Sequence, residues 1–178
     1  MKLIKTDFDG LTIIKHNIFV DNRGYFKEKF KKEELKKIIN YKQEFCQENS
    51  VKSHKNVLRG LHFQKEPYSQ SKLISVSFGK ILDVVVDIRK DSENYGKYFS
   101  YVLSSENHES LYIPKGFAHG YLTLSDSAII DYQVDNYYNP EAEDGIPYND
   151  EFLNIDWGIQ MSKIIISEKD KNIKPFIW

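Results

Sequence analysis

Short apolar stretches alternate with polar positions and turn residues along most of this chain. Residues 73–78, 80–88, 117–124 and 127–134 are rich in β-branched and aromatic side chains, and residues 111–113 end at a proline. Glycine, proline or serine–aspartate steps separate these stretches at short intervals, which is typical of successive β-strands. No helical pattern interrupts the series. The pattern therefore predicts an antiparallel all-β barrel or jelly roll.

One segment has a helical pattern. Leu35, Ile38 and Ile39 follow i, i+3, i+4 spacing within residues 31–40 and are surrounded by lysines and glutamates, which predicts a short peripheral helix. The chain has no linker rich in Gly, Pro or Ser, no internal repeat and no low-complexity tract. One domain is therefore expected over residues 1–178.

Some polar side chains fall on apolar strand faces. Because successive side chains in a strand point to opposite sides, Asp83 shares a face with Val85 in the strand 80–88. It faces either a lined cavity or an ordinary solvated surface. His119 and Tyr132 lie on largely apolar faces. Each of these two residues is either a hydrogen-bonded core residue or a functional group.

The densest group of polar residues in an apolar stretch lies in residues 56–64. Gly60 stands between Arg59 and His62, and its lack of a side chain permits tight backbone geometry or the close approach of a ligand. A planar guanidinium binds phosphate through two hydrogen bonds, but it pairs equally well with a carboxylate. Both interpretations stay open for Arg59.

Composition and charge restrict the classes of partner. Lys plus Arg total 25 and Asp plus Glu total 26, for a net charge of -1, which lacks the basic excess of nucleic-acid-binding proteins. The N-terminal residues lack an apolar signal core, and no stretch approaches the roughly 20 apolar residues of a membrane span. A cytoplasmic protein without nucleic-acid or membrane partners is expected. The single cysteine, Cys46, cannot form an internal disulfide, which suits a reducing compartment.

The spacing of the histidines argues against a metal centre. Metal sites in β-barrels often use two histidines one residue apart, since positions i and i+2 point the same way. Here Gln64 stands two residues after His62, and Tyr121 stands two residues after His119. The chain contains no His-x-His step, so neither a metal nor another cofactor is predicted.

Several motifs, taken in their order along the chain, match one enzyme family. They are Asp21–Phe26, Gln47–Asn49, Leu58–Gln64, Gln70–Leu73, Asp83–Arg89, Ile113–Gly120, Tyr137–Pro140 and Ser167–Asp170. Through them the chain resembles the dTDP-4-dehydrorhamnose 3,5-epimerases over nearly its whole length. The resemblance implies a cupin-type jelly roll with short peripheral helices and a dTDP-4-keto-6-deoxyhexose substrate. It also implies a homodimer in which the strand around Arg23 to Glu28 reaches into the partner's site.

The implied reaction explains why particular residues are needed. A 4-keto group acidifies the hydrogens at C3 and C5, removal of one gives an enolate, and a proton returned to the opposite face inverts the carbon. By resemblance His62 is the base, which suits an imidazole with a reference pKa of about 6.5, and Asp170 pairs with it and fixes its tautomer. Lys72 stabilises the enolate, and Tyr132 is the acid on the other face.

The resemblance also assigns binding residues. Arg23 and Arg59 resemble the family's contacts to the diphosphate. Further positions resemble contacts to the nucleotide or the sugar: Glu28, Gln47, Glu48, Asn49, His119, Glu143 and Lys169. An ordinary surface or structural role is the alternative for each of them, above all for Glu143 and Lys169 in their charged stretches.

Two positions depart from the family pattern, and three other functions compete with the implied one. Tyr148 stands where Trp is common and Gln133 where Lys is frequent, which leaves the exact sugar and the number of inverted centres open. An epimerase that inverts only C3 or only C5 of a related nucleotide sugar is the main alternative, since it would share the base and the acid. A non-catalytic sugar-binding cupin is disfavoured because base, acid and lysine are all present. A metal-dependent cupin is disfavoured by the missing His-x-His step.

Overall fold

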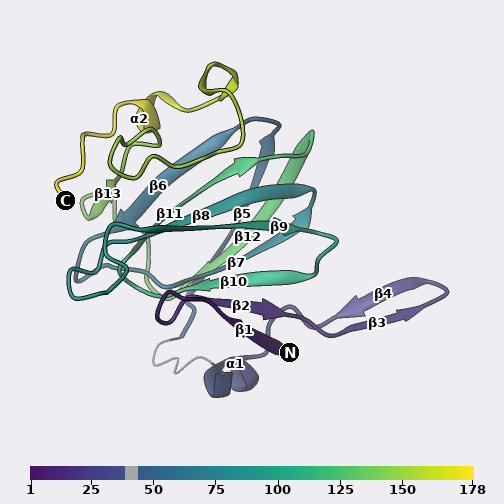
Figure 1. The fold of residues 1–178 in the computed structure, drawn as a ribbon. Helices are drawn as coiled ribbons and strands as arrows, with labels where there is room; N and C mark the ends of the chain where they lie inside the picture. The colour runs from purple at the N-terminus through teal and green to yellow at the C-terminus, as the bar shows by residue number, and fades with distance from the viewer. Residues whose placement is uncertain (39–43) are drawn as a thin grey trace.

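Two antiparallel sheets form the walls of a barrel in the computed structural model, which describes residues 1–38 and 44–178 (Figure 1). The six-stranded sheet contains, in spatial order, β1 (Lys2–Lys5), β2 (Thr12–Lys15), β10 (Glu109–Ile113), β7 (Lys72–Phe78), β12 (Ser127–Val134) and β5 (Gln47–His54). The five-stranded sheet contains β13 (Glu143–Gly145), β6 (Leu58–Gln64), β11 (Phe117–Thr123), β8 (Lys80–Asp87) and β9 (Tyr98–Ser104). The prediction of an all-β jelly roll is confirmed.

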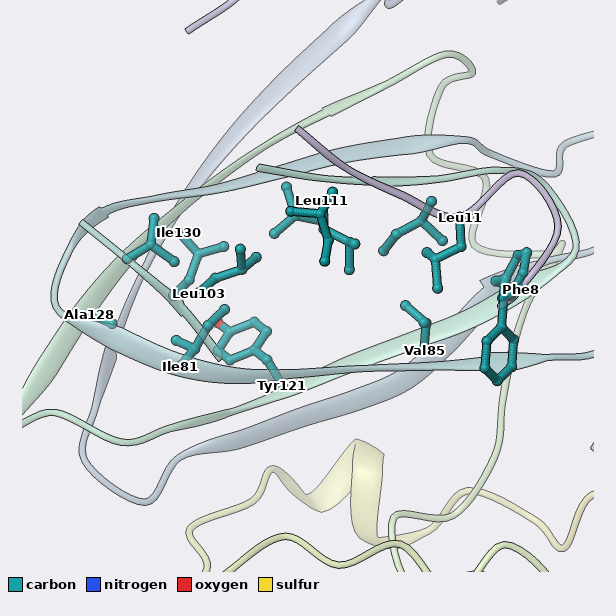
Figure 2. Packing of buried hydrophobic residues seen from close by; sticks show 14 residues of the cluster. Phe8, Leu11, Ile81, Val85, Leu103, Leu111, Tyr121, Ala128 and Ile130 are labelled. Atoms are coloured by element: carbon teal, nitrogen blue, oxygen red, sulfur yellow. The ribbon is translucent and has the colours of Figure 1, made fainter. Parts of the chain in front are cut away.

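The main hydrophobic core lies between the two sheets (Figure 2). Strand alternation directs Ile74 and Val76 of β7 and Ile130 of β12 inward, where they join Ile81 and Val85 of β8 in one cluster. Each of these side chains is at most 2 % exposed. Complete burial of one such side chain stabilises a fold by about 1.5–3 kcal/mol, so this layer holds the two walls of the barrel at a fixed separation.

The C-terminal segment covers the outer face of the five-stranded sheet (Figure 1). Leu153 and Trp157 belong to a second hydrophobic cluster that includes Val84 and Val86 of β8. Because β8 is thus buried on both faces, Asp83 on its inner face has no exposed surface. The solvated-face interpretation of Asp83 is therefore wrong.

A hairpin projects from the barrel and is called the arm below (Figure 1). It consists of β3 (Ile18–Asp21) paired with β4 (Gly24–Lys27). Its large exposed side chains are Phe19, Val20, Tyr25 and Phe26. An isolated two-stranded hairpin is marginally stable in water, and an exposed apolar patch marks an interaction surface. The arm therefore has the character of a segment that is covered by a partner.

The predicted helix is present as α1 (Lys32–Ile38). Ile39 and Asn40, which the pattern assigns to the same helix, lie outside the described residues. Leu35 is 2 % exposed and packs in a cluster with Ile14, so the helix is attached to the six-stranded sheet through its apolar side. In the described part of the chain, no helix combines the length and apolar character needed to cross a membrane.

One buried histidine makes the fold sensitive to acid. His16 is 5 % exposed, its Nε2 lies 2.7 Å from Oγ of Ser110, and its Nδ1 has no hydrogen-bond partner among the described residues. Burial, aided by the charge of Lys27, lowers the pKa of His16 from 6.5 to about 4. As the pH falls below 6.5, the unfolded chain therefore takes up a proton that the folded chain does not.

Lowering the pH from about 7 to about 4.5 should reduce the free energy of unfolding by roughly 2 kcal/mol through His16. This contribution is complete above the unfolded pKa and is lost as the pH approaches the folded pKa. Urea unfolding of the wild type and of His16→Asn at both pH values measures it. The variant should lose this part of the pH dependence, whereas His54→Asn, at an exposed position of β5, should keep it. Equal pH dependence in wild type and His16→Asn would contradict the prediction.

Candidate active site

Two neighbouring cavities between the sheets are together called the cleft. The first has a volume of about 250 Å³ and the second of about 360 Å³. His62 of β6, Lys72 of β7 and Tyr132 of β12 line both of them. The structure thus brings together three side chains from three strands that lie far apart in the sequence, and it places them where the two cavities come together.

His62 is held by Asp170, which lies in the short helix α2 (Glu168–Lys171). Nε2 of His62 is 2.8 Å from Oδ1 of Asp170, and the backbone N–H of Gly60 donates to Oδ2 at 3.3 Å. Ser167 caps the helix, because its Oγ accepts a hydrogen bond of 3.1 Å from the backbone N–H of Asp170. The carboxylate is therefore fixed from both the barrel and the C-terminal segment.

The state of Asp170 determines which ring nitrogen of His62 is the donor and which is the acceptor. Burial alone would raise the pKa of Asp170, but the hydrogen bond and charge of His62 and the N–H of Gly60 outweigh it and hold the pKa below 3.8. The ionised carboxylate only accepts hydrogen bonds. Nε2 of His62 therefore donates, and in the neutral imidazole Nδ1 is left free to accept a proton.

Tyr132 and His62 stand on opposite walls of the cleft, because β12 belongs to the six-stranded sheet and β6 to the five-stranded sheet. In the register of β12 with β7, Tyr132 is opposite Ile74 and Val134 is opposite Lys72. Tyr132 and Lys72 are thus diagonal neighbours on the same inner face. A ring bound between the walls would have the imidazole on one side and the phenol on the other.

Burial shifts the titration of two of these groups. Loss of water around the ammonium lowers the pKa of Lys72 from 10.5 to about 8, although the charges of Asp83 and Glu143 oppose this. Burial likewise raises the pKa of the Tyr132 phenol above 10.0, with the charge of Arg59 acting against it. At neutral pH Lys72 is then mostly a cation and Tyr132 a neutral phenol. These are the forms that stabilise an oxyanion and donate a proton.

Arg59 lines the first cavity, and its guanidinium is available to a ligand. Its Nε donates to Oγ of Ser53 at 3.3 Å, and that oxygen also lies 2.9 Å from the hydroxyl of Tyr121. Within the described residues, Arg59 forms no ion pair with a carboxylate. The interpretation of Arg59 as the partner of a nearby carboxylate is therefore without support in the structure.

His119 also lines the first cavity and has a carboxylate partner of its own. Its Nε2 donates to Oδ2 of Asp83 at 2.9 Å. The side chain of His119 is 10 % exposed and that of Asp83 is fully buried. The sequence directs both side chains inward by strand alternation, but it does not pair them.

Polar residues from three segments surround the second cavity. On β5, Nε2 of Gln47 donates to Oδ1 of Asn49 at 2.9 Å. Oε2 of Glu143 accepts hydrogen bonds from the hydroxyl of Tyr138 at 2.6 Å and from Nζ of Lys169 at 2.5 Å. Lys169 lines the first cavity, and Glu143 and Tyr138 line the second. Glu143, Tyr138 and Lys169 are therefore hydrogen-bonded to one another, and together they border both cavities of the cleft.

Several residues line the cleft although the sequence does not assign them to the site, among them Gln64, Gln70, Tyr121 and Tyr138. Strand alternation was an available signal for Gln64 and Tyr121, because each stands two residues after a predicted site histidine. Gln70 and Tyr138 lie in loops, where no periodicity indicates the direction of a side chain.

Two predicted diphosphate and nucleotide contacts lie away from the cleft of their own chain. Arg23 is at the tip of the arm, where its side chain is 85 % exposed and pairs with Asp21 at 2.5 Å. Glu28 follows the arm and is exposed. One chain alone therefore does not bring Arg23 or Glu28 to the catalytic groups.

Glu48 lies outside the cleft of its own chain. It stands between Gln47 and Asn49 on β5, so strand alternation directs it to the outer face of the sheet. There its Oε2 accepts a hydrogen bond of 3.3 Å from Nε2 of Gln133. Gln133 thus also lies outside the cleft, and Tyr148 lines neither cavity. The two departures from the family pattern leave the lining of the cleft unchanged.

The fold and the cleft define a jelly-roll protein in which an imidazole, a phenol and an ammonium surround one binding space. No three His, Cys, Asp or Glu side chains among the described residues are grouped as metal ligands would be. The sequence profile of dTDP-4-dehydrorhamnose 3,5-epimerase matches residues 5–177. The enzyme of that name from Escherichia coli (strain K12) is 45 % identical over 173 residues, covering 97 % of this chain and 93 % of that protein. The chain belongs to the dTDP-4-dehydrorhamnose 3,5-epimerase family and is an epimerase, as the sequence motifs predict.

Two solved structures are also similar to this chain. The Legionella pneumophila Philadelphia 1 dTDP-6-deoxy-D-glucose-3,5-epimerase, in complex with dTDP-4-keto-L-rhamnose, has a TM-score of 0.94 and 41 % identity, covering 98 % of this chain and 92 % of that one. A 3'-monoepimerase from Streptomyces bikiniensis, in complex with dTDP-quinovose, has a TM-score of 0.89 and 28 % identity, covering 96 % of this chain and 85 % of that one. Proteins that differ in the number of inverted centres thus share this fold.

Gly60 brings β6 and β11 into unusually close contact beside His62. Its φ is +111°, and a Cβ at this position would lie 2.5 Å from Cα of Gly120 and 2.7 Å from the carbonyl oxygen of His119. Gly158 also has a positive φ, of +67°, but a Cβ added there would have no other atom within 4 Å. A side chain at either glycine would strain the backbone, but only a side chain at Gly60 would also overlap with neighbouring atoms.

Gly60→Ala should lower the free energy of unfolding by about 3 kcal/mol, because overlap with β11 adds to backbone strain. Gly158→Ala should cost about 1 kcal/mol, because only the backbone conformation is unfavourable there. Urea unfolding of both variants measures the two values. Equal losses would mean that the close approach of β6 and β11 contributes nothing at Gly60.

Proposed function

We propose that this epimerase inverts C3 and C5 of dTDP-4-keto-6-deoxyglucose and so produces dTDP-4-keto-rhamnose, by proton transfer through an enolate. The placement of His62 and Tyr132 on opposite walls of the cleft, with Lys72 beside both cavities, is the observation that carries the proposal. The family of the chain and the dTDP-4-keto-L-rhamnose bound to the Legionella relative support it.

Each inversion uses the same three groups. Nδ1 of His62 removes the proton from the carbon beside the ketone, and the electron pair moves onto O4 to give the enolate. The ammonium of Lys72 stabilises the charge on O4. Tyr132 then gives its proton to the opposite face of the carbon, which an enolate is basic enough to take. Exchange with water removes the proton from His62 and returns one to Tyr132, so both groups are restored before the second inversion. Proton transfer alone accomplishes this chemistry, so the proposal assigns no metal or cofactor.

The diphosphate and nucleotide require cations and polar groups around the cleft. Arg59, without a carboxylate partner among the described residues, suits a phosphate oxygen through its planar fork. Lys169 supplies a further donor in the first cavity, and Nδ1 of His119 can accept a hydrogen bond there. Gln47 and Asn49 line the second cavity and suit hydrogen bonds to the nucleotide.

The arm supports a homodimer with strand exchange. Its exposed aromatic side chains would be covered by a partner surface. Arg23 lies at the tip of the projecting arm, away from the cleft of its own chain. A second copy related by a two-fold axis would receive the arm and return its own. Arg23 and Glu28 of each arm would then complete the binding site of the other chain.

A single-centre epimerase is the second candidate function. The Streptomyces bikiniensis relative is a 3'-monoepimerase with the same fold, and one base and one acid suffice for either outcome. A non-catalytic sugar-binding protein is less well supported, because the base, the acid and the lysine all line one cleft.

Tyr132→Phe should retain nucleotide-sugar binding and reduce inversion by at least about 100-fold, because the ring stays and only the acidic proton is lost. The measurement is NMR of dTDP-4-keto-6-deoxyglucose in deuterated water, which follows C3 and C5 separately. The wild type should incorporate deuterium at both carbons. Tyr148→Phe, which lies outside the cleft, is the matched control and should behave as wild type.

An unchanged rate of inversion in Tyr132→Phe would remove Tyr132 from the mechanism. Deuterium at only one carbon in the wild type would establish the single-centre alternative. Absence of exchange at both carbons, from folded protein, would contradict the proposed substrate.

Mixed dimers test strand exchange. His62→Asn has a defective cleft and an intact arm, whereas Arg23→Glu has an intact cleft and an arm that repels the diphosphate. Co-refolding the two in equal amounts should restore about one quarter of the wild-type activity, since half of the dimers then contain one complete site. His62→Asn mixed with Asp170→Asn should restore none, because both defects lie in the cleft. Activity no higher than that of the separate variants would contradict an exchanged arm.

A further inference from the structure

A fully buried carboxylate lies beside the first cavity. Asp83 has no exposed surface, and its neighbours on the inner face of β8 are Ile81 and Val85 of the main core. Its Oδ2 accepts the hydrogen bond from His119, whereas its Oδ1 is buried without a partner among the described residues. A charge in such surroundings is costly and an unpaired oxygen is rare, so the position calls for a functional explanation.

Three ionisable groups of the cleft are close enough to respond to Asp83. His119 of β11 donates to it at 2.9 Å. Tyr121 of β11 is directly opposite Asp83 in the register of β8 with β11. Burial and, more weakly, the charge of Asp83 raise the pKa of Tyr121. Burial lowers the pKa of Lys72, and the charge of Asp83, together with that of Glu143, opposes this lowering.

The strand on the other side of Asp83 does not neutralise it. Tyr101 of β9 is opposite Asp83 in the register of β8 with β9. Its hydroxyl donates to Oε2 of Glu109 at 2.8 Å, and burial followed by this contact raises the pKa of Tyr101 to about 12. Tyr101 is thus a neutral group that is already engaged, and the groups that respond to Asp83, namely His119, Tyr121 and Lys72, line the cleft.

We propose that Asp83 is a positioning residue of this site, which acts on the substrate through His119 and Lys72 without touching it. The proposal rests on the proposed function, in which Lys72 stabilises the enolate. By accepting the hydrogen bond from Nε2–H, Asp83 fixes the ring and the tautomer of His119. Its negative charge partly offsets the lowering of the Lys72 pKa by burial and so keeps the amine protonated at neutral pH.

The separation between Asp83 and Lys72 suits this role. Among the described residues no carboxylate lies within 4.0 Å of Nζ of Lys72, so the ammonium is not captured in an ion pair. It therefore remains free to approach a substrate oxygen. The field of a buried charge still reaches it, because screening is weak inside a protein. A direct ion pair would hold the charge equally well but would compete with the enolate for the same ammonium.

The decisive measurement is the pKa of the Lys72 amine, obtained by NMR titration of protein labelled at lysine, with Lys72→Arg used to assign the signal. In Asp83→Asn this pKa should fall by about one unit, because the charge is lost while the shape is kept. Asp87→Asn is the matched control. Asp87 is also fully buried on the inward side of β8, but it pairs with Arg89, and its replacement should leave Lys72 unchanged.

An unchanged pKa of Lys72 in Asp83→Asn would overturn the proposal. If the Asn variant does not fold, Asp83→Ser is measured in its place, since a hydroxyl still accepts from His119 and leaves room for water. The titration needs no turnover, so it stays decisive even if the wild type fails to act on the proposed sugar, which would contradict the proposed function alone.

The pH profile of kcat provides a second test. The basic limb should move to lower pH in Asp83→Asn by the amount found for Lys72, so that activity lost above neutral pH is partly recovered below it. His119→Gln should lower the rate without moving this limb. A uniform loss of rate at every pH in Asp83→Asn would mean that Asp83 acts only as a structural residue or only through His119.

Discussion

The hydrogen bond between His62 and Asp170 is the interaction on which the site depends. The two residues are 108 positions apart and meet at 2.8 Å only because the C-terminal segment packs on the five-stranded sheet. Trp157 is 2 % exposed in that packing, so the position of α2 is set by the same hydrophobic cluster that covers β8. The ionised carboxylate then fixes the proton of His62 on Nε2 and leaves Nδ1 as the acceptor nitrogen of the neutral ring.

The barrel supplies the environment that makes these groups reactive. Strand alternation places Lys72 and Tyr132 on inner faces that otherwise carry core residues, and burial brings the pKa of Lys72 to about 8 while it keeps Tyr132 protonated. An ammonium that has lost much of its water interacts more strongly with a developing enolate than an exposed one would. The fixed separation of the two sheets holds the imidazole of His62 and the phenol of Tyr132 on opposite sides of the space between them.

The pattern of the sequence was sufficient for the strands and for the inward direction of His119 and Tyr132, because period two is a local property. For Asp83 it left a lined cavity and a solvated surface both open. Asp170 could be assigned only through family motifs, since no local rule connects residues so distant along the chain. Glu48 lies outside the cleft although it belongs to the same motif as Gln47 and Asn49, because a strand turns the middle of three consecutive residues the other way. The predicted contact of Arg23 with the substrate cannot be located in one chain, because the arm that carries Arg23 projects away from the barrel.

The tautomer of His62 tests most directly how the site is organised. Nitrogen-15 NMR of labelled protein distinguishes a protonated from an unprotonated ring nitrogen in the neutral imidazole. The hydrogen bond to Asp170 predicts that Nε2 of His62 carries the proton and that Nδ1 does not, and that this preference is lost in Asp170→Ala. A neutral His62 protonated at Nδ1 in the wild-type protein would contradict the assignment of the base.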